Sequence, residues 1–263
     1  MTAVRTLLDD HVATLVLDGP GRGNAFSVEM MDDFAAAVSA VGRDPNVRAV
    51  VITGTGDAFS TGADFAAMPA FAAESGRGSL GVHAAIERIY SAFLAVDRLE
   101  VPTIAAVNGH AVGGGFGVAL LCDIRIVSET GKIGANFVKL GIHPGMAISH
   151  LLPAAVGYEV AAELLYTGRL VQGPEAVSLG LARRCVPRDE VLPVAQALAA
   201  QIAAAAPLAV RATKKTLRNA ARAQLSAHLH TEALAQALLM QSEDAKEGID
   251  AMLTRRSPTF KGR

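Results

Sequence analysis

Short apolar runs alternate along this chain with longer segments in which apolar residues recur every three or four positions. Runs rich in Val, Ile and Leu and bounded by Gly, Pro, Asn or Asp predict strands, whereas Ala/Leu spacing predicts helices. The predicted strands are residues 4–8, 12–18, 49–53, 101–107 and 124–127, with short extended pieces at Ile133 and 181–186. The predicted helices are residues 27–41, 80–96, 148–156, 159–167, 174–179, 189–205, 225–241 and 243–253, with others opening near Gly114 and at Pro207. This order is that of one α/β domain.

A run of glycines joins one predicted strand to one predicted helix. Residues 101–107 lead through the turn 108–112 into Gly113-Gly114-Gly115, where the helix opens. Without Cβ atoms a ligand can approach the main chain, and the first helical amides carry the positive end of the dipole. These features fit an anion site. The glycines fit equally well a helix packed tightly on a strand, and by themselves they leave both interpretations open.

A second loop offers backbone amides at a strand end. It spans residues 57–65 and follows the apolar strand 49–53. Two such loops are what an oxyanion hole requires. Together with Asn24-Ala25 and with Pro258-Thr259-Phe260-Lys261 near the end, these stretches resemble the crotonase (enoyl-CoA hydratase/isomerase) superfamily. The resemblance covers essentially the whole chain.

The resemblance implies an α/β fold with a crotonase (ClpP-like) ββα spiral core and a C-terminal helical region that forms trimers. We expect the core at residues 1–200 and the helical extension at 201–263, as one functional unit. The extension has an Ala/Leu periodicity, so its apolar face must be buried somewhere. By resemblance, the partner is a second copy of the chain, in a homotrimer or a dimer of trimers.

The resemblance also assigns a substrate site. A thioester carbonyl would be held by the N–H groups of Ala63 and Gly114, and coenzyme A would enter only as part of the substrate. The residues expected to bind the acyl-CoA are Arg22, Ala25, Ala63, Asp64, Phe65, Ala66, Gly114, Gly117, Phe137, Phe260 and Lys261. Arg22 fits either a phosphate contact or a solvated loop position. Asp64 fits a loop-fixing role better than a catalytic one, and Phe260 with Lys261 would meet the adenine nucleotide.

The chain departs from the hydratases of this superfamily at their two glutamates. One of these glutamates lies three residues after the middle glycine of the triplet, where this chain has Gly117. The other lies just ahead of the Leu-Gly…Pro-Gly segment, where this chain has Phe137. Hydration needs an acid and a base, and neither residue transfers protons. We therefore predict a different enolate reaction: isomerisation, decarboxylation, retro-Claisen cleavage or thioester cleavage. The alternative is a non-catalytic acyl-CoA carrier or sensor. The same two residues predict an apolar pocket with extra room on one side.

Histidine supplies the remaining candidate chemistry. His143 lies in the loop expected to border the acyl group and is a candidate acid/base group. The alternative is a structural ring that is hydrogen-bonded to the backbone beside Pro144. His110 is expected to support the glycine turn. His83 and Glu87 lie one helical turn apart, and an exposed pair is favoured over an acid/base pair in the pocket.

Composition excludes other function classes. The formal net charge is −1, from 24 Lys and Arg against 25 Asp and Glu, which gives no bulk attraction to nucleic acid or an anionic membrane. The two cysteines, Cys122 and Cys185, lack metal-ligand spacing and suggest buried thiols, so no metal site is predicted. There is no signal-peptide pattern at the start and no long uninterrupted apolar run, which makes the cytoplasm the expected location.

Overall fold

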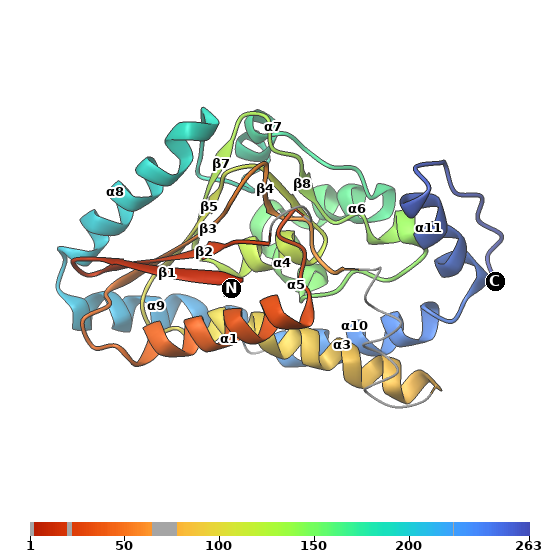
Figure 1. The fold of residues 1–263 in the computed structure, drawn as a ribbon, viewed down its shortest axis with the longest axis horizontal. Helices are drawn as coiled ribbons and strands as arrows, with labels where there is room; N and C mark the ends of the chain where they lie inside the picture. The colour runs from red at the N-terminus through yellow and green to blue at the C-terminus, as the bar shows by residue number, and fades with distance from the viewer. Residues whose placement is uncertain (1–2, 20–22, 65–77, 223) are drawn as a thin grey trace.

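The computed structural model describes residues 3–19, 23–64, 78–222 and 224–263, and it contains two β-sheets surrounded by helices (Figure 1). The larger sheet has the strand order β1-β2-β3-β5-β7-β9, and the smaller has the order β4-β6-β8. The strands are β1 (Val4–Asp9), β2 (Val12–Leu17), β3 (Ala49–Gly54), β4 (Ala58–Ser60), β5 (Thr103–Val107), β6 (His110–Val112), β7 (Ile124–Ser128), β8 (Ile133–Gly134) and β9 (Arg184–Val186).

Consecutive strands alternate between the two sheets. β3, β5 and β7 lie in the larger sheet, and the strands that directly follow them, β4, β6 and β8, lie in the smaller one. All of these pairings are parallel, whereas β1 and β2 form the predicted antiparallel hairpin, which turns at Asp10. The chain therefore winds as a spiral of β-β-helix units, and the predicted spiral core is confirmed.

The helices cover the sheets and extend the molecule at both ends (Figure 1). They are α1 (Val28–Arg43), α3 (Gly78–Leu94), α4 (Gly114–Leu121), α5 (Ile148–Val156), α6 (Tyr158–Thr167), α7 (Gly173–Ser178), α8 (Val191–Ala203), α9 (Pro207–Arg222), α10 (Leu225–Leu239) and α11 (Glu243–Leu253). Short 3-10 helices lie at η1 (Val96–Arg98), η2 (Phe137–Leu140) and η3 (Arg188–Glu190). Ser27 and Ser242 cap α1 and α11, as predicted, by accepting from the amides of Met30 and Ala245. The predicted C-terminal helices are thus present.

Helix α8 packs on one face of the larger sheet. Its buried positions Val191, Ala195, Ala199 and Ala203 recur every four residues, so a narrow stripe of mostly small side chains faces the strands. The stripe joins a buried cluster with Val12, Ala49, Val51, Ile104, Ala106 and Ile126. The strands β2 and β5 are buried along their whole length, which explains their continuous apolar sequences. The expected boundary at residue 200 falls inside this core-packing helix.

Two strands lie where loops were predicted. β4 forms part of the 57–65 loop and β6 part of the glycine turn, and they pair with each other. A three-residue strand is too short to show a period of two, so only its tertiary partner reveals it. Gly109 is needed here because a Cβ would lie 2.0 Å from the Asp57 carbonyl oxygen. This prediction of loops was therefore wrong for six residues, β4 and β6 together.

Both cysteines are free. Cys122 is buried, as predicted, whereas Cys185 is only partly buried. Burial, followed by the neighbouring charge of Asp123, raises the pKa of the Cys122 thiol to about 12. That thiol is therefore protonated and unreactive near neutral pH.

No single helix in the described part of the chain is long and apolar enough to cross a membrane, and only a bent pair, Arg188–Ala203 with Pro207–Asn219, meets that test jointly, with a 110° bend between its halves.

An ion network fixes α9 to the core. Asp123 receives Lys214 Nζ at 3.0 Å and Arg218 Nε at 2.8 Å, and it also accepts from the Thr103 amide at 2.7 Å. Burial alone would raise the pKa of the Asp123 carboxyl, but the charges of Lys214 and Arg218 outweigh it and hold that pKa below its ordinary value. Burial also lowers the pKa of the Lys214 ammonium against the attraction of Asp123. Asp123 is therefore the carboxylate that Lys214 and Arg218 share, and Arg218 also contacts Asp97 Oδ1 at 3.1 Å.

Replacing Asp123 by Asn should lower the free energy of unfolding by about 3 kcal/mol at pH 7, because it leaves the buried Lys214 ammonium without its carboxylate and removes one of the two carboxylates that pair with Arg218. The contribution of a carboxyl with a depressed native pKa is full above its unfolded value of about 3.9 and is lost as the pH falls through the native value. Urea unfolding at a series of pH values should thus show the two proteins converging in acid. Asp250→Asn, at an exposed ion pair, should cost less than about 1 kcal/mol; an equal cost would contradict the assignment.

Candidate active site

A cavity of about 290 Å³ opens between the two strand-end loops and the helices α3 and α10. Ala63 and Gly114, the predicted oxyanion-hole residues, both line it, together with Ala25 and Asp64. Most of the remaining wall is apolar: Phe26, Ile86, Ile89, Phe93, Phe137, Leu140, Ile142, Met146, Met240, Met252 and Leu253. A mostly apolar cavity with backbone amides at one side is suited to a ligand that has an apolar chain and a polar group at one end.

The two loops touch through glycine backbone. Gly62 has φ +86, and a Cβ there would lie 2.8 Å from both the Gly114 nitrogen and the Val112 carbonyl oxygen. Gly113, with φ +55, is the N-terminal cap of α4. Only glycine at position 62 lets the loops approach this closely, and glycine at position 113 adopts the positive φ without strain.

The amides that this approach brings together are available to a ligand. Gly114 is the first residue of α4, so its N–H has no partner within the helix. Phe26 donates its amide to the Gly62 carbonyl at 2.8 Å, which fixes the strand-end loop just before Ala63. Among the described residues, no backbone hydrogen bond uses the N–H of Ala63 or of Gly114. Both N–H groups are therefore free to bind a ligand.

Buried polar side chains hold the loops in place. The Asn24 amide nitrogen donates to the carbonyl oxygens of Thr55 and Ala58 at 3.0 and 2.8 Å, and the Asn24 Oδ1 accepts from Gly19 at 2.9 Å. Ser60 Oγ donates to the Asn24 carbonyl at 2.8 Å. Asn24 itself has φ +54, a conformation that Asn tolerates better than most residues. These contacts position the neighbouring Ala25 at the cavity.

The two positions that lack glutamate are filled with apolar atoms. Gly117 lies in α4, and a Cβ there would lie 2.5 Å from the Met146 Cβ. Met146 lines the cavity, so the extra room expected beside Gly117 does not exist: that prediction was wrong, because the Met146 side chain occupies the space. Phe137, buried at the start of η2, lines the cavity as predicted, and its ring lies beside Gly113.

A buried carboxylate positions the Met146 loop. Met146 and Ala147 have φ +65 and +58, which is strained for residues with a Cβ. Glu232 on α10 accepts hydrogen bonds from the Ala147 amide at 2.6 Å and the Ser149 amide at 2.9 Å. Burial raises the pKa of the Glu232 carboxyl, against these hydrogen bonds. The hydrogen bonds that Glu232 accepts at the start of α5 offset the strain of the turn that places Met146 against Gly117.

Polar groups of the cavity wall come from two helices. Tyr90 Oη on α3 donates to Gln236 Oε1 on α10 at 3.0 Å, and Gln236 Nε2 donates to the His143 carbonyl at 2.7 Å. Burial and then the charge of Glu232 raise the pKa of the Tyr90 hydroxyl, so it remains a proton donor. The sequence analysis did not identify Tyr90 or Gln236, because no local pattern links residues so far apart in the chain.

The histidine expected to act in the pocket lies beside it. His143 is absent from the described cavity lining, and its Nδ1 lies 2.6 Å from the Pro144 carbonyl oxygen. This is the backbone-bonded arrangement that was left open for it. His110 lies in β6, where its Nδ1 accepts from the Lys132 amide at 3.1 Å. Neither imidazole belongs to the described cavity lining.

The remaining predicted residues lie apart from the cavity or outside the described chain. Phe260 is exposed, and the Lys261 amide donates to Asp244 Oδ1 at 2.6 Å on the surface of α11. Three other residues, Arg22, Phe65 and Ala66, lie outside the described residues. A nucleotide contact at Phe260 and Lys261 therefore stays a prediction.

Comparison with known proteins decides the family. The sequence profile described as Enoyl-CoA hydratase/isomerase matches residues 8–263. The chain belongs to the enoyl-CoA hydratase/isomerase family. It is 40% identical over 254 residues to a Thermus thermophilus protein named provisionally as an enoyl-CoA hydratase, covering 95% of this chain and 97% of that one. It is 35% identical over 255 residues to the crotonyl-CoA hydratase of Syntrophomonas wolfei, covering 96% and 95%.

Solved structures agree with this assignment. The crystal structure of an enoyl-CoA hydratase from Mycobacterium avium subsp. paratuberculosis matches with a TM-score of 0.86 and 28% identity, covering 98% of both chains. An enoyl-CoA hydratase/isomerase from Pseudoalteromonas atlantica also gives 0.86, with 30% identity, 98% of this chain and 100% of the other. The crotonase fold is thus confirmed, and the protein is an enzyme of this family.

Adding a methyl group at position 117 tests the Met146 contact. Gly117→Ala should lower the free energy of unfolding by about 1–3 kcal/mol, because the new Cβ overlaps Met146. In a Met146→Gly background the same change should cost much less, since the Cβ that a side chain at position 117 would meet at 2.5 Å is gone. Urea unfolding of the single and double variants gives the coupling energy. Additive effects would show that Met146 does not fill the space beside Gly117.

Proposed function

We propose that this protein binds an acyl-CoA thioester, holds its carbonyl oxygen with the N–H groups of Ala63 and Gly114, and catalyses an enolate reaction other than glutamate-dependent hydration. The single observation that carries the proposal is the meeting of two donor loops at an apolar cavity whose acid/base positions hold Gly117 and Phe137. Each oxyanion donor of this kind contributes about 3–4 kcal/mol to the transition state.

The case against hydration rests on proton transfer. Water addition requires one group to activate water and one to protonate the α-carbon, and positioned groups of this kind contribute about 10²–10⁴-fold. The space beside Gly117 is taken by Met146, and Phe137 is buried, so neither position supplies a carboxylate or another group that transfers protons. Reactions in which the substrate itself supplies or loses the group at the α-carbon need only the enolate-stabilising amides. Isomerisation, decarboxylation and C–C or thioester cleavage are the candidate classes.

The cavity supports an apolar acyl group. Its wall combines three phenylalanines with Ile, Leu and Met side chains, while Tyr90 and Gln236 are hydrogen-bonded to each other. Because these two polar groups are hydrogen-bonded to each other, they do not need a hydrogen bond from the ligand. With Met146 beside Gly117, the cavity is narrowed on that side, so length rather than width is the dimension in which acyl groups should be distinguished.

We further propose a homotrimer or a dimer of trimers in the cytoplasm. Large apolar side chains are exposed on α9 and α10, including Leu208, Leu217, Leu234 and Leu238. Such residues are unusual on a free surface when several lie on neighbouring helices, and another copy of the chain would cover them. In such an assembly Phe260 and Lys261 could serve the nucleotide of a neighbouring subunit. No metal or cofactor takes part in this proposed reaction.

The decisive experiment is a mass-spectrometric turnover screen of the purified protein with enoyl-, β-keto-, malonyl-type and aryl-containing acyl-CoAs, with thermal shift measured in parallel. Conversion of a class other than trans-2-enoyl-CoA supports the proposal and identifies the reaction. Fast hydration of a simple trans-2-enoyl-CoA would overturn the argument from Gly117 and Phe137. Stabilisation by a thioester without any conversion would instead favour an acyl-CoA carrier or sensor.

Removing one donor tests the oxyanion hole. Gly114→Pro lacks the N–H and should lower kcat on the identified thioester by about 10²–10³-fold. Gly114→Ala is the matched control, because it keeps the N–H and its Cβ meets its nearest neighbours at 3.6–3.8 Å. Circular dichroism and the thermal midpoint establish that both variants are folded. Unchanged turnover in a folded proline variant would exclude Gly114 as a donor.

A further inference from the structure

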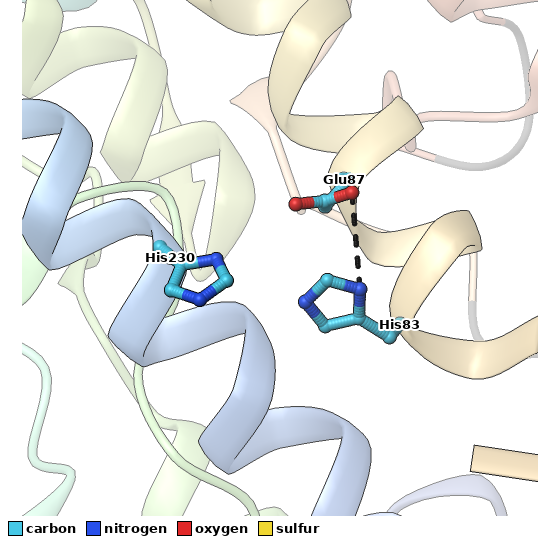
Figure 2. A group of neighbouring side chains, drawn as sticks. All are labelled: His83, Glu87 and His230. Atoms are coloured by element: carbon cyan, nitrogen blue, oxygen red, sulfur yellow. Dashed lines mark ion pairs between the residues drawn. The ribbon is translucent and has the colours of Figure 1, made fainter. Parts of the chain in front are cut away.

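Three side chains that could hold a metal meet on helices α3 and α10, apart from the oxyanion amides (Figure 2). His83 and Glu87 lie one turn apart on α3, and His230 lies on α10. His83 Nδ1 lies 3.8 Å from Glu87 Oε2, and the two imidazole rings have centroids 6.0 Å apart at an angle of 82°. One ligand-type atom from each residue lies within 4.8 Å of those of the other two.

One ring nitrogen of His83 has no hydrogen-bond partner among the described residues. Its Nε2 is buried and makes no hydrogen bond with any residue in the described part of the chain. A buried polar atom without a partner is uncommon and costly in a folded protein. Figure 2 shows one ring nitrogen of His83 facing Glu87 and the other on the side of His230. The cluster is therefore not an ordinary exposed ion pair, since its central ring is mostly covered.

We propose that His83, Glu87 and His230 bind one divalent metal ion of the zinc class, with the fourth position taken by water. Two imidazole nitrogens and one carboxylate oxygen form a ligand set that zinc accepts in proteins. Ligand atoms on one tetrahedral zinc ion lie about 3.4 Å apart, given bond lengths of about 2.1 Å. The ligand atoms of the three residues lie within 4.8 Å of one another, which is further apart than on a bound ion. Glu87 and His230 are exposed, so small side-chain rotations close the remaining gap.

The ion would join two helices that also form the wall of the cavity. Tyr90, seven residues beyond His83 on α3, is hydrogen-bonded to Gln236 on α10. The metal would provide a second link between the same helices, nearer their N-termini. It would fix the separation of α3 and α10 and so the width of the cavity between them. The site stands independently of the proposed reaction, because none of its three residues lines the cavity in the described chain.

The test uses full-length protein without a histidine tag, stripped with a chelator and titrated with zinc chloride by calorimetry. We expect one zinc ion per chain and a rise of several degrees in the thermal midpoint, since a ligand that binds the folded state stabilises it. His83→Gln and His230→Gln should each weaken binding at least tenfold. Glu87→Gln, an exposed change with little risk to folding, should weaken it less.

His228→Gln is the matched control. His228 lies two residues before His230 on the same helix, but it stacks on His150 at 4.7 Å instead of joining the cluster. This variant should bind zinc like the unchanged protein. The proposal is overturned if the protein binds no zinc, if His83→Gln and His230→Gln bind it unchanged, or if His228→Gln abolishes binding in their place.

Discussion

The site depends on the contact between two stretches of bare backbone. Gly62 meets the nitrogen of Gly114 and the carbonyl of Val112 at a distance that no Cβ permits. This contact places the Ala63 and Gly114 amides at one edge of the cavity, and both remain free of partners within the described chain. The parallel pairing of β4 with β6 delivers the two loops to the same place. Donors fixed in advance by packed backbone need not reorganise when charge develops on a bound oxygen.

A second constraint acts from the far side of the cavity. Glu232 on α10 holds the strained Met146–Ala147 turn through the Ala147 and Ser149 amides, and that turn sets Met146 against Gly117. Position 117 therefore differs by more than the lack of a glutamate, because the Met146 side chain fills the space that a larger residue there would need. A carboxylate introduced there would have to displace Met146 and be buried without a partner, which is costly. Relatives of this chain bear hydratase names, and this local packing is an observation on which our proposal of a different reaction rests.

Helices α3 and α10 connect the cavity with the surface. They lie side by side along the molecule (Figure 1), with Tyr90 and Gln236 paired at the cavity and His83, Glu87 and His230 clustered further along. Because both features bridge the same pair of helices, a ligand at one place would be sensitive to the spacing that the other fixes. Coupling of this kind requires only that the two helices move as rigid elements.

The sequence by itself determined the fold family, the strands β1, β2, β3, β5 and β7, and most helix ends, because these elements carry long apolar patterns and local caps such as Ser27 and Ser242. It also located the loops that carry Ala63 and Gly114 and the apolar residues at 117 and 137. Only the tertiary structure decided what fills the space beside Gly117, that His143 lies beside the cavity and not in it, and that His230 joins His83 and Glu87. Each of these depends on contacts between residues distant in the chain, where no local periodicity or propensity carries information.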